Sequence, residues 1–224
     1  MDRSVPPAIA LPDGTQVLHM DDSCLAVDKP AGLLCVPGRG PQKQDCLARR
    51  VQQQYADALV VHRLDMATSG VWLMARGAPM QRALGQAFEQ QAVHKRYVAV
   101  VAGRVAPPAS ADGWGDIDLP IGADWPRRPL QQIDHERGRP SQTRWRILEA
   151  GARTTRLELM PRTGRSHQLR VHLKAIGHPI LGDTLYAPPE VQALAPRLLL
   201  HACALRLAHP ASGLPLEIDC PAPF

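Results

Sequence analysis

Short apolar runs broken by proline and glycine are the feature that most constrains how this chain can fold. The 224 residues include 22 prolines and 17 glycines, so turns and extended segments are frequent and a helical bundle is excluded. A strand or strand pair is expected over 17–28, and further strands over 71–74, 97–102, 144–148, 154–160, 198–207 and 216–218. Few helices separate these runs. The order favours an α+β fold with a mixed, largely antiparallel sheet over a doubly wound parallel sheet.

Three segments have the apolar spacing of helices that flank such a sheet. Asp45 is expected to cap a short helix, and apolar residues within 80–88 mark one face of a second helix. A third helix is predicted over 166–176, with Ser166 as its N-cap and Gly177 just past its end.

Composition excludes several classes of protein. Hydrophobic residues make up 45% and charged residues 21% of the chain, which are values of a globular domain and not of a disordered chain. No apolar run approaches the roughly 18 residues of a membrane span, and residues 1–14 lack the pattern of a signal peptide. The five cysteines form no C-x-x-C pair, so we expect reduced, packed thiols, no metal and a cytoplasmic location.

Positive charge is concentrated in one part of the sequence. Residues 127–174 hold twelve Lys or Arg against four Asp or Glu, a balance of +8, while the rest of the chain carries −3. Such a stretch is either a binding surface for a polyanion or a solvated face. On the predicted third helix, Arg170 and Lys174 lie one turn apart on a shared face, where both could reach phosphates. No G-x-G-x-x-G or G-x-x-x-x-G-K-[ST] motif is present, so no nucleotide cofactor is expected.

Three polar clusters could carry chemistry. Asp65 precedes a Thr-Ser-Gly turn, where it is either a turn residue or a nucleophile; if the residues before it are extended, Arg63 shares its face. Arg165 lies just before a predicted helix start, where it could hold a phosphate or a carboxylate such as Asp65. Tyr97 follows two cations and could stack on a base or begin a strand as a core aromatic.

Together these segments resemble the RluA family of RNA pseudouridine synthases. The resemblance rests on HRLDMATSG at 62–70, KRY at 95–97, RTGRSHQLRVH at 162–172, GHPILGDTLYA at 177–187 and LLLHA at 198–202. It implies a single catalytic domain over residues 1–224 with a central RNA-binding cleft. It also implies an isomerase that detaches uracil from its ribose, rotates it and rejoins it through carbon 5, without a metal or a consumed cofactor. We expect a monomer that does not bind membranes.

The resemblance assigns roles to individual residues. Asp65 matches the catalytic aspartate, Tyr97 the tyrosine that packs against the target base, and Arg165 the arginine that pairs with the aspartate. Arg63 resembles the arginine that fills the gap left by the extruded base. The basic stretch would supply phosphate contacts through Arg127, Arg128, Arg162, Arg170 and Lys174.

The family resemblance also bears on the substrate. The catalytic pattern begins near the first residue, so no N-terminal S4-type domain is expected. Segments 124–129 and 195–202 are most similar to the family member with dual specificity for large-subunit ribosomal RNA and the tRNA anticodon stem-loop. Three alternatives stay open: a synthase for one of these RNAs, a non-catalytic RNA-binding protein or chaperone with the same fold, and a metal-dependent hydrolase, which no ligand spacing supports.

Overall fold

The computed structural model describes residues 10–224, which divide into two compact units. The first unit extends to Val93 and adds Leu205–Pro221, and the second comprises His94–Ala204 and Ala222–Phe224. Strand β11 (Leu200–Ala208) contributes residues to both. Residues 1–9, part of the segment tested above for a signal peptide, lie outside the described residues. The assignment of one catalytic domain to the whole chain stays a prediction.

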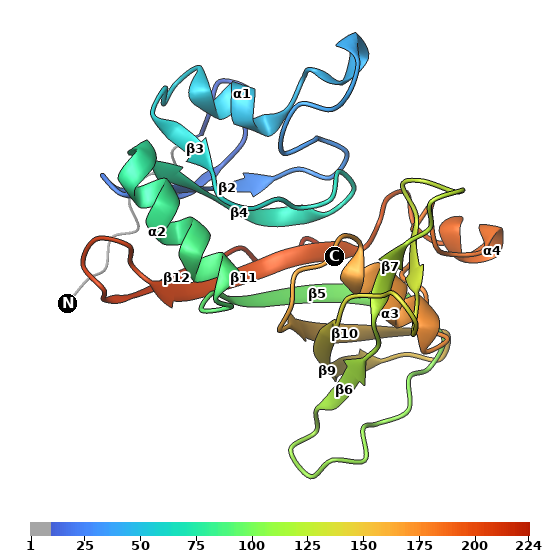
Figure 1. The fold of residues 1–224 in the computed structure, drawn as a ribbon. Helices are drawn as coiled ribbons and strands as arrows, with labels where there is room; N and C mark the ends of the chain where they lie inside the picture. Colours follow the sequence, from blue (N-terminus) through green and yellow to red (C-terminus); the bar gives the residue numbers. More distant parts are fainter. Residues whose placement is uncertain (1–9) are drawn as a thin grey trace. The chain divides into compact units, whose positions relative to one another are not determined.

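The first unit is built on strands in the order β1-β2-β4-β11, with β3 beside β4 and β12 beside β11 (Figure 1). The pairs β1–β2, β2–β4 and β3–β4 are antiparallel. Its elements are β1 (Val17–Met20), β2 (Cys24–Lys29), a 3-10 helix η1 (Pro41–Lys43), α1 (Leu47–Gln52), β3 (Ala58–Val60), β4 (Ser69–Arg76), α2 (Gly77–Glu89) and β12 (Pro215–Asp219). The expected strand pair over 17–28 is therefore confirmed as β1 and β2.

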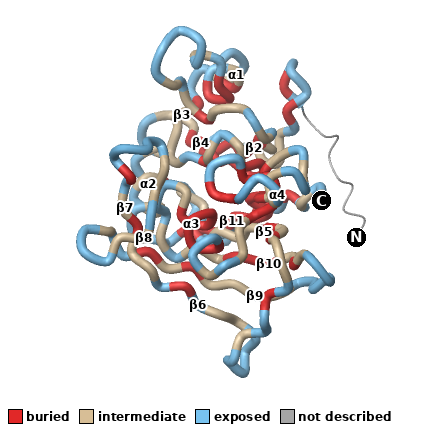
Figure 2. The backbone as a smooth tube through the Cα atoms, turned by 90° about the vertical axis from the view of Figure 1, so that its right-hand side faces the viewer, coloured by how far each residue is buried: buried red, intermediate tan, exposed pale blue. Residues whose placement is uncertain are grey.

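The core of the first unit lies between α2 and the sheet. Strand β4 is buried from Ser69 to Ala75, in line with a strand covered on both faces, and this burial is visible in Figure 2. Leu84 of α2 is buried in the same apolar cluster as Leu73 and Leu205, and Phe88 packs against it. The apolar spacing within 80–88 thus marks the buried face of α2, as predicted.

The second unit contains strands in the order β11-β5-β10-β9-β6, and a separate two-stranded sheet of β7 and β8. Its elements are β5 (His94–Ala102), β6 (Gly115–Asp118), β7 (Ile121–Ala123), β8 (Gln131–Ile133), β9 (Gln142–Ala150), β10 (Thr154–Pro161), α3 (Gln168–Ala175) and α4 (Pro189–Gln192). The strand pairs β5–β10, β9–β10, β6–β9 and β7–β8 are antiparallel and helices are few, so the predicted α+β class with a largely antiparallel sheet is confirmed.

Both predicted helix caps are wrong. The N-cap of α1 is Cys46, because the carboxylate of Asp45 instead accepts hydrogen bonds from Arg50 Nε at 2.9 Å and Nη2 at 2.6 Å. Helix α3 begins at Gln168, and its N-cap is His167, whose φ of 56° is left-handed. Ser166 therefore lies outside the helix.

The end of α3 follows the prediction. Gly177 has a φ of 86°, a conformation that suits glycine, and His178 N–H donates to Leu173 O at 2.9 Å across it. All five cysteines are buried thiols, also as expected. Within residues 10–224 no helix has the length and hydrophobicity needed to cross a membrane.

Candidate active site

A closely held loop between β3 and β4 carries Asp65. Thr68 N–H donates to Asp65 O at 3.1 Å, which closes a turn directly after the half-buried aspartate. On the other side, the buried thiol of Cys35 accepts from Leu64 N–H at 3.3 Å and donates to Leu64 O at 3.4 Å. The backbone on both sides of Asp65 is thus fixed, which favours a defined direction for its side chain.

A fully buried lysine supports the same loop. Lys29 Nζ, at the end of β2, donates to Met66 O at 3.0 Å and to Pro30 O at 2.8 Å. Burial lowers the pKa of Lys29 to about 8, although the charge of Asp65 opposes the change. The sequence analysis missed this residue; its signal is a lysine at the end of a mostly apolar strand and immediately before a proline.

The side chains before Asp65 alternate between the solvent side and the protein interior, as in an extended segment. Leu64 is buried, Arg63 is exposed, and the ring of His62 stacks on Phe88 with ring centroids 4.4 Å apart. His62 Nε2 accepts a hydrogen bond from Leu73 N–H at 3.1 Å, a structural role for this histidine. The exposed guanidinium of Arg63 therefore lies two residues from Asp65 on the solvent side of the segment.

In the second unit, Tyr97 lies on β5 opposite Leu159 of β10 and is half-buried. Two residues earlier on the same strand, Lys95 Nζ donates to Thr163 O at 3.3 Å. Burial lowers the pKa of Lys95. Lys95 therefore ties the strand that carries Tyr97 to the loop that carries Arg165, a contact that the sequence analysis missed.

A buried glutamine shapes the Arg165 loop. Gln168 Oε1 accepts hydrogen bonds from Arg165 N–H at 3.0 Å and from Thr163 Oγ1 at 2.8 Å. Its amide nitrogen donates to Gln142 O and to Thr143 Oγ1, each at 3.0 Å. Arg165 itself is exposed. Asp65 belongs to the first unit and Arg165 to the second, and their pairing stays a prediction.

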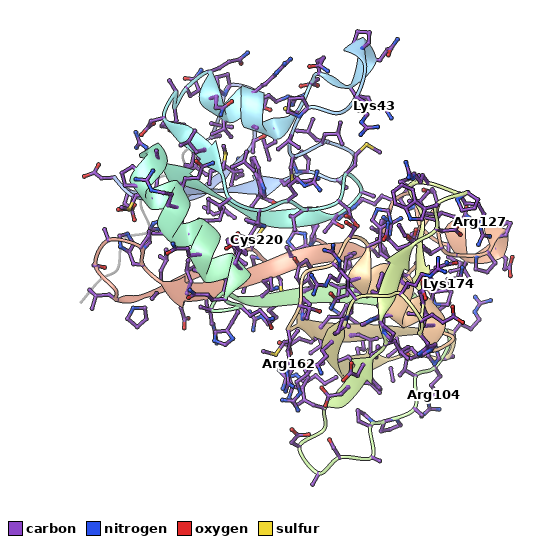
Figure 3. The ribbon with its side chains drawn as sticks, viewed as in Figure 1. Lys43, Arg104, Arg127, Arg162, Lys174 and Cys220 are labelled. Atoms are coloured by element: carbon purple, nitrogen blue, oxygen red, sulfur yellow. The ribbon has the colours of Figure 1, made fainter. Side chains whose placement is uncertain are left out.

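The predicted RNA-binding residues of the second unit fall into two groups. Arg127, Arg128, Arg162 and Lys174 are exposed. Figure 3 labels Arg127 in the β7–β8 loop, Arg162 just after β10 and Lys174 on α3. Arg170 differs, because its side chain is 3% exposed and both Nε and Nη2 bind Asp183, at 2.9 and 2.6 Å. The expectation that Arg170 reaches phosphates is therefore wrong: α3 turns this face into the protein.

Part of the positive charge of residues 127–174 is neutralised within the chain. Arg144 Nη2 lies 2.8 Å from Asp112 Oδ2, and Arg146 Nε lies 2.6 Å from Glu158 Oε2. Arg127 Nη2 lies 2.6 Å from the buried carboxylate of Asp124 but keeps a side chain that is 71% exposed. The basic surface is consequently smaller than the sequence balance of +8 indicates.

A cluster of His19, Asp21 and Cys24 in the first unit has atoms close enough for a metal ion. Asp21 Oδ2, however, accepts hydrogen bonds from His19 Nε2 at 2.7 Å and from His209 Nε2 at 3.1 Å. Burial raises the pKa of Cys24 to about 12, so its thiol stays protonated. These hydrogen bonds join the β1–β2 and β11–β12 turns and account for the cluster without an ion.

Comparison with known proteins decides the family. Residues 23–175 match the family described as RNA pseudouridylate synthase. The chain belongs to the RNA pseudouridine synthase family. The synthase is an isomerase that acts on RNA, and the predicted family, enzyme class and fold class are confirmed.

Relatives of the synthase match nearly all of it. It is 49% identical over 209 residues to the dual-specificity RNA pseudouridine synthase RluA of Escherichia coli O6:H1, covering 93% of each chain. It is 46% identical to the protein of that name from Yersinia pestis, covering 93% of this chain and 99% of that one.

Two solved human structures have a similar fold. RNA Pseudouridylate Synthase Domain Containing 1 has a TM-score of 0.75 at 27% identity and covers 94% of this chain and 84% of its own. RNA Pseudouridylate Synthase Domain Containing 4 has a TM-score of 0.69 at 26% identity, with coverage of 92% and 88%.

Proposed function

We propose that this synthase converts specific uridines to pseudouridine in both large-subunit ribosomal RNA and the tRNA anticodon stem-loop. The observation that carries the proposal is the similarity along 93% of the chain to synthases named for dual specificity. Stem-loops from two RNAs can present the same arrangement of unpaired bases, and recognition of single-stranded loops is the usual route to specificity for RNA. Such substrates place the enzyme in the cytoplasm, where we expect it to act as a monomer.

Asp65 is the proposed catalytic residue. Cleavage of the bond between uracil and ribose builds positive charge on the sugar, which a nearby carboxylate can stabilise, attack or relieve by removing a proton. The contacts of Cys35 and Lys29 with Leu64 and Met66 hold the backbone on both sides of Asp65. A carboxylate on such a loop needs little reorganisation when the charge develops.

Tyr97 and Arg165 are proposed to complete the site. The phenol ring of Tyr97 offers a flat surface against the extruded uracil and a hydroxyl for the late loss of the proton at carbon 5. Arg165 is proposed to pair with Asp65 and keep its carboxylate ionised. Extrusion of a base costs a few kcal/mol, and the exposed planar guanidinium of Arg63 is suited to fill the gap in the stack.

The exposed Arg127, Arg128, Arg162 and Lys174 are proposed to contact phosphates of the RNA. The chemistry assigned to Asp65, Tyr97 and Arg165 consumes no cofactor and calls for no metal. We therefore expect the rate of isomerisation to be the same with and without EDTA.

Release of tritium from RNA that carries 5-tritiated uridine tests the proposal, because isomerisation expels the hydrogen at carbon 5. An anticodon stem-loop and a large-subunit ribosomal RNA fragment are assayed separately. Release from both supports dual specificity, and release from one contradicts it while retaining the chemistry. Absence of release from either, with RNA binding intact, points first to a different RNA target and second to the non-catalytic alternative.

A further inference from the structure

The loop that joins β7 to β8 presents an aromatic side chain to solvent. Trp125 is 67% exposed, more than the other large hydrophobic residues of the described chain, and the neighbouring residues 126–129 are also exposed. The guanidinium carbon of Arg128 lies 3.3 Å from the centre of the Trp125 ring. The two planar groups therefore form a stacked pair at the tip of the hairpin.

Hydrogen bonds and an ion pair fix the conformation of the β7–β8 loop. Asp124 is 5% exposed, and its carboxylate binds the Arg127 guanidinium through Nε at 2.7 Å. Backbone hydrogen bonds close the loop from Asp124 N–H to Leu130 O at 3.0 Å and from Leu130 N–H to Arg127 O at 3.0 Å. Isolated hydrophobic residues on a surface are common; an exposed tryptophan on a loop fixed in this way is preorganised to stack.

The hairpin is anchored to the segment that carries Arg165. Gln131 N–H donates to Tyr186 Oη at 2.8 Å, and the same hydroxyl lies 2.6 Å from Nδ1 of His167, the residue before α3. Ile121 of β7 belongs to one buried cluster with Tyr186 and Val171 of α3. The exposed tip therefore has a defined position relative to the start of α3, three residues after Arg165.

We propose that Trp125 and Arg128 form a stacking platform for an unpaired base of the RNA other than the uridine that reacts. The inference rests on the stem-loop substrate proposed above. An indole face and a guanidinium plane can each stack on any base, and Arg127 and Lys174 supply positive charge for the adjoining phosphates. Lys174 lies near the hairpin, because its Nζ is 5.8 Å from the centre of the Tyr186 ring that anchors it. A second base held in this way would fix the register in which the loop presents its target.

Binding of a fluorescein-labelled anticodon stem-loop and of a fully paired duplex of equal length tests the platform. Stacking on one base contributes enough that Trp125→Ala should weaken stem-loop binding by about tenfold. Duplex binding and the slope of affinity against salt should not change, because no phosphate contact is removed. Trp125→Phe, which keeps an aromatic face, should restore most of the affinity, and in turnover KM should rise with little change in kcat.

Two further variants make the test specific. Leu214→Ala removes a side chain that is 66% exposed in the first unit and should leave both affinities unchanged. Arg128→Lys keeps the charge and loses the planar group, so it should weaken stem-loop binding more than duplex binding.

Three results would overturn the platform. Trp125→Ala could lose the same affinity for stem-loop and duplex, Leu214→Ala could lose as much stem-loop affinity as Trp125→Ala, or Trp125→Ala could keep full stem-loop affinity. A Trp125→Ala variant that sediments differently from wild type but keeps its stem-loop affinity would also overturn the platform, and it would indicate that Trp125 contacts another protein chain. A wild-type enzyme that binds stem-loop and duplex alike contradicts the proposed substrate and the platform together. A wild-type preference that persists in Trp125→Ala contradicts the platform alone.

Discussion

Two lysines lie beside the proposed catalytic residues, each bound to a backbone carbonyl. Lys29 is fully buried and Lys95 is half-buried. Lys29 donates to Met66 O next to Asp65, and Lys95 donates to Thr163 O two residues before Arg165. Burial of an ammonium group is costly, and burial lowers the pKa of both side chains. Apolar residues would fill these positions at a lower cost in folding free energy. We therefore infer that the role of the two lysines is to fix the loops that carry Asp65 and Arg165.

The dependence of stability on pH tests the state of Lys29. Burial lowers its pKa from 10.5 to about 8, so between these values the unfolded chain binds more protons than the folded one. The free energy of unfolding should therefore rise with pH across this window, by up to about 3 kcal/mol from this group. Urea denaturation at pH 7.5 and 10 measures it, and Lys29→Met should lack this increment. The same slope in wild type and Lys29→Met would contradict the assignment.

At the scale of elements, α3 organises the second unit through polar residues that face inward. Gln168, Arg170 and His172 are all buried on this helix. His172 Nε2 bonds to Leu119 O at 2.9 Å, and burial lowers the pKa of the ring. The helix thus contributes a hydrogen-bonded network to the protein interior, and Figure 2 shows it as one of the buried segments.

The buried pair of Arg170 and Asp183 gives a prediction for this helix. Arg170→Met leaves Asp183 without its cation, although Leu185 and Tyr186 N–H still donate to it. We expect the free energy of unfolding to fall by about 3–5 kcal/mol, the usual cost of breaking a buried ion pair. Lys174→Ala, an exposed change on the same helix, should stay within about 0.5 kcal/mol of wild type. Chemical denaturation separates the two, and equal stabilities would contradict the role of the pair.

Gln168 gives a second prediction for the same element. Gln168→Ala removes the acceptor of the Arg165 N–H, while the Gln142 carbonyl keeps the Arg162 N–H at 3.0 Å as a donor. We therefore expect a loss of about 1–3 kcal/mol in stability. The loop that carries Arg165 should also become mobile. Hydrogen exchange at Arg165 N–H should therefore accelerate more than exchange in β5. Uniform protection in both segments would show that Gln168 does not hold this loop.

At the scale of the whole molecule, the proposed function assigns affinity for RNA to the exposed cations and the chemistry to Asp65. Removal of one phosphate contact should reduce the slope of log affinity against log salt by roughly 0.7–0.9. We expect this change in Arg127→Ala. Arg170 is buried and binds Asp183, so folded Arg170→Lys protein should have the same salt slope as wild type. Binding isotherms at several salt concentrations measure both slopes, and a reduced slope in Arg170→Lys would place its guanidinium on RNA.

The sequence predicts the elements of this fold well because apolar periodicity and proline or glycine breaks are local properties. The roles proposed for Asp65, Tyr97 and Arg165 rest on multi-residue motifs and stay predictions. The sequence does not reveal Lys29, Lys95 or Gln168, because their roles depend on backbone atoms brought near by the fold. It also places Arg170 on the wrong side of α3, since helical spacing does not identify the side covered by Asp183.

The measurement that tests the account most directly is tritium release by Asp65→Asn, with RNA affinity measured on the same preparation. The substitution keeps the size of the side chain and removes its charge, so we expect release to be abolished while stem-loop affinity stays within about threefold of wild type. Loss of release together with full affinity would assign the chemistry to Asp65. Release at the wild-type rate would contradict the proposed mechanism.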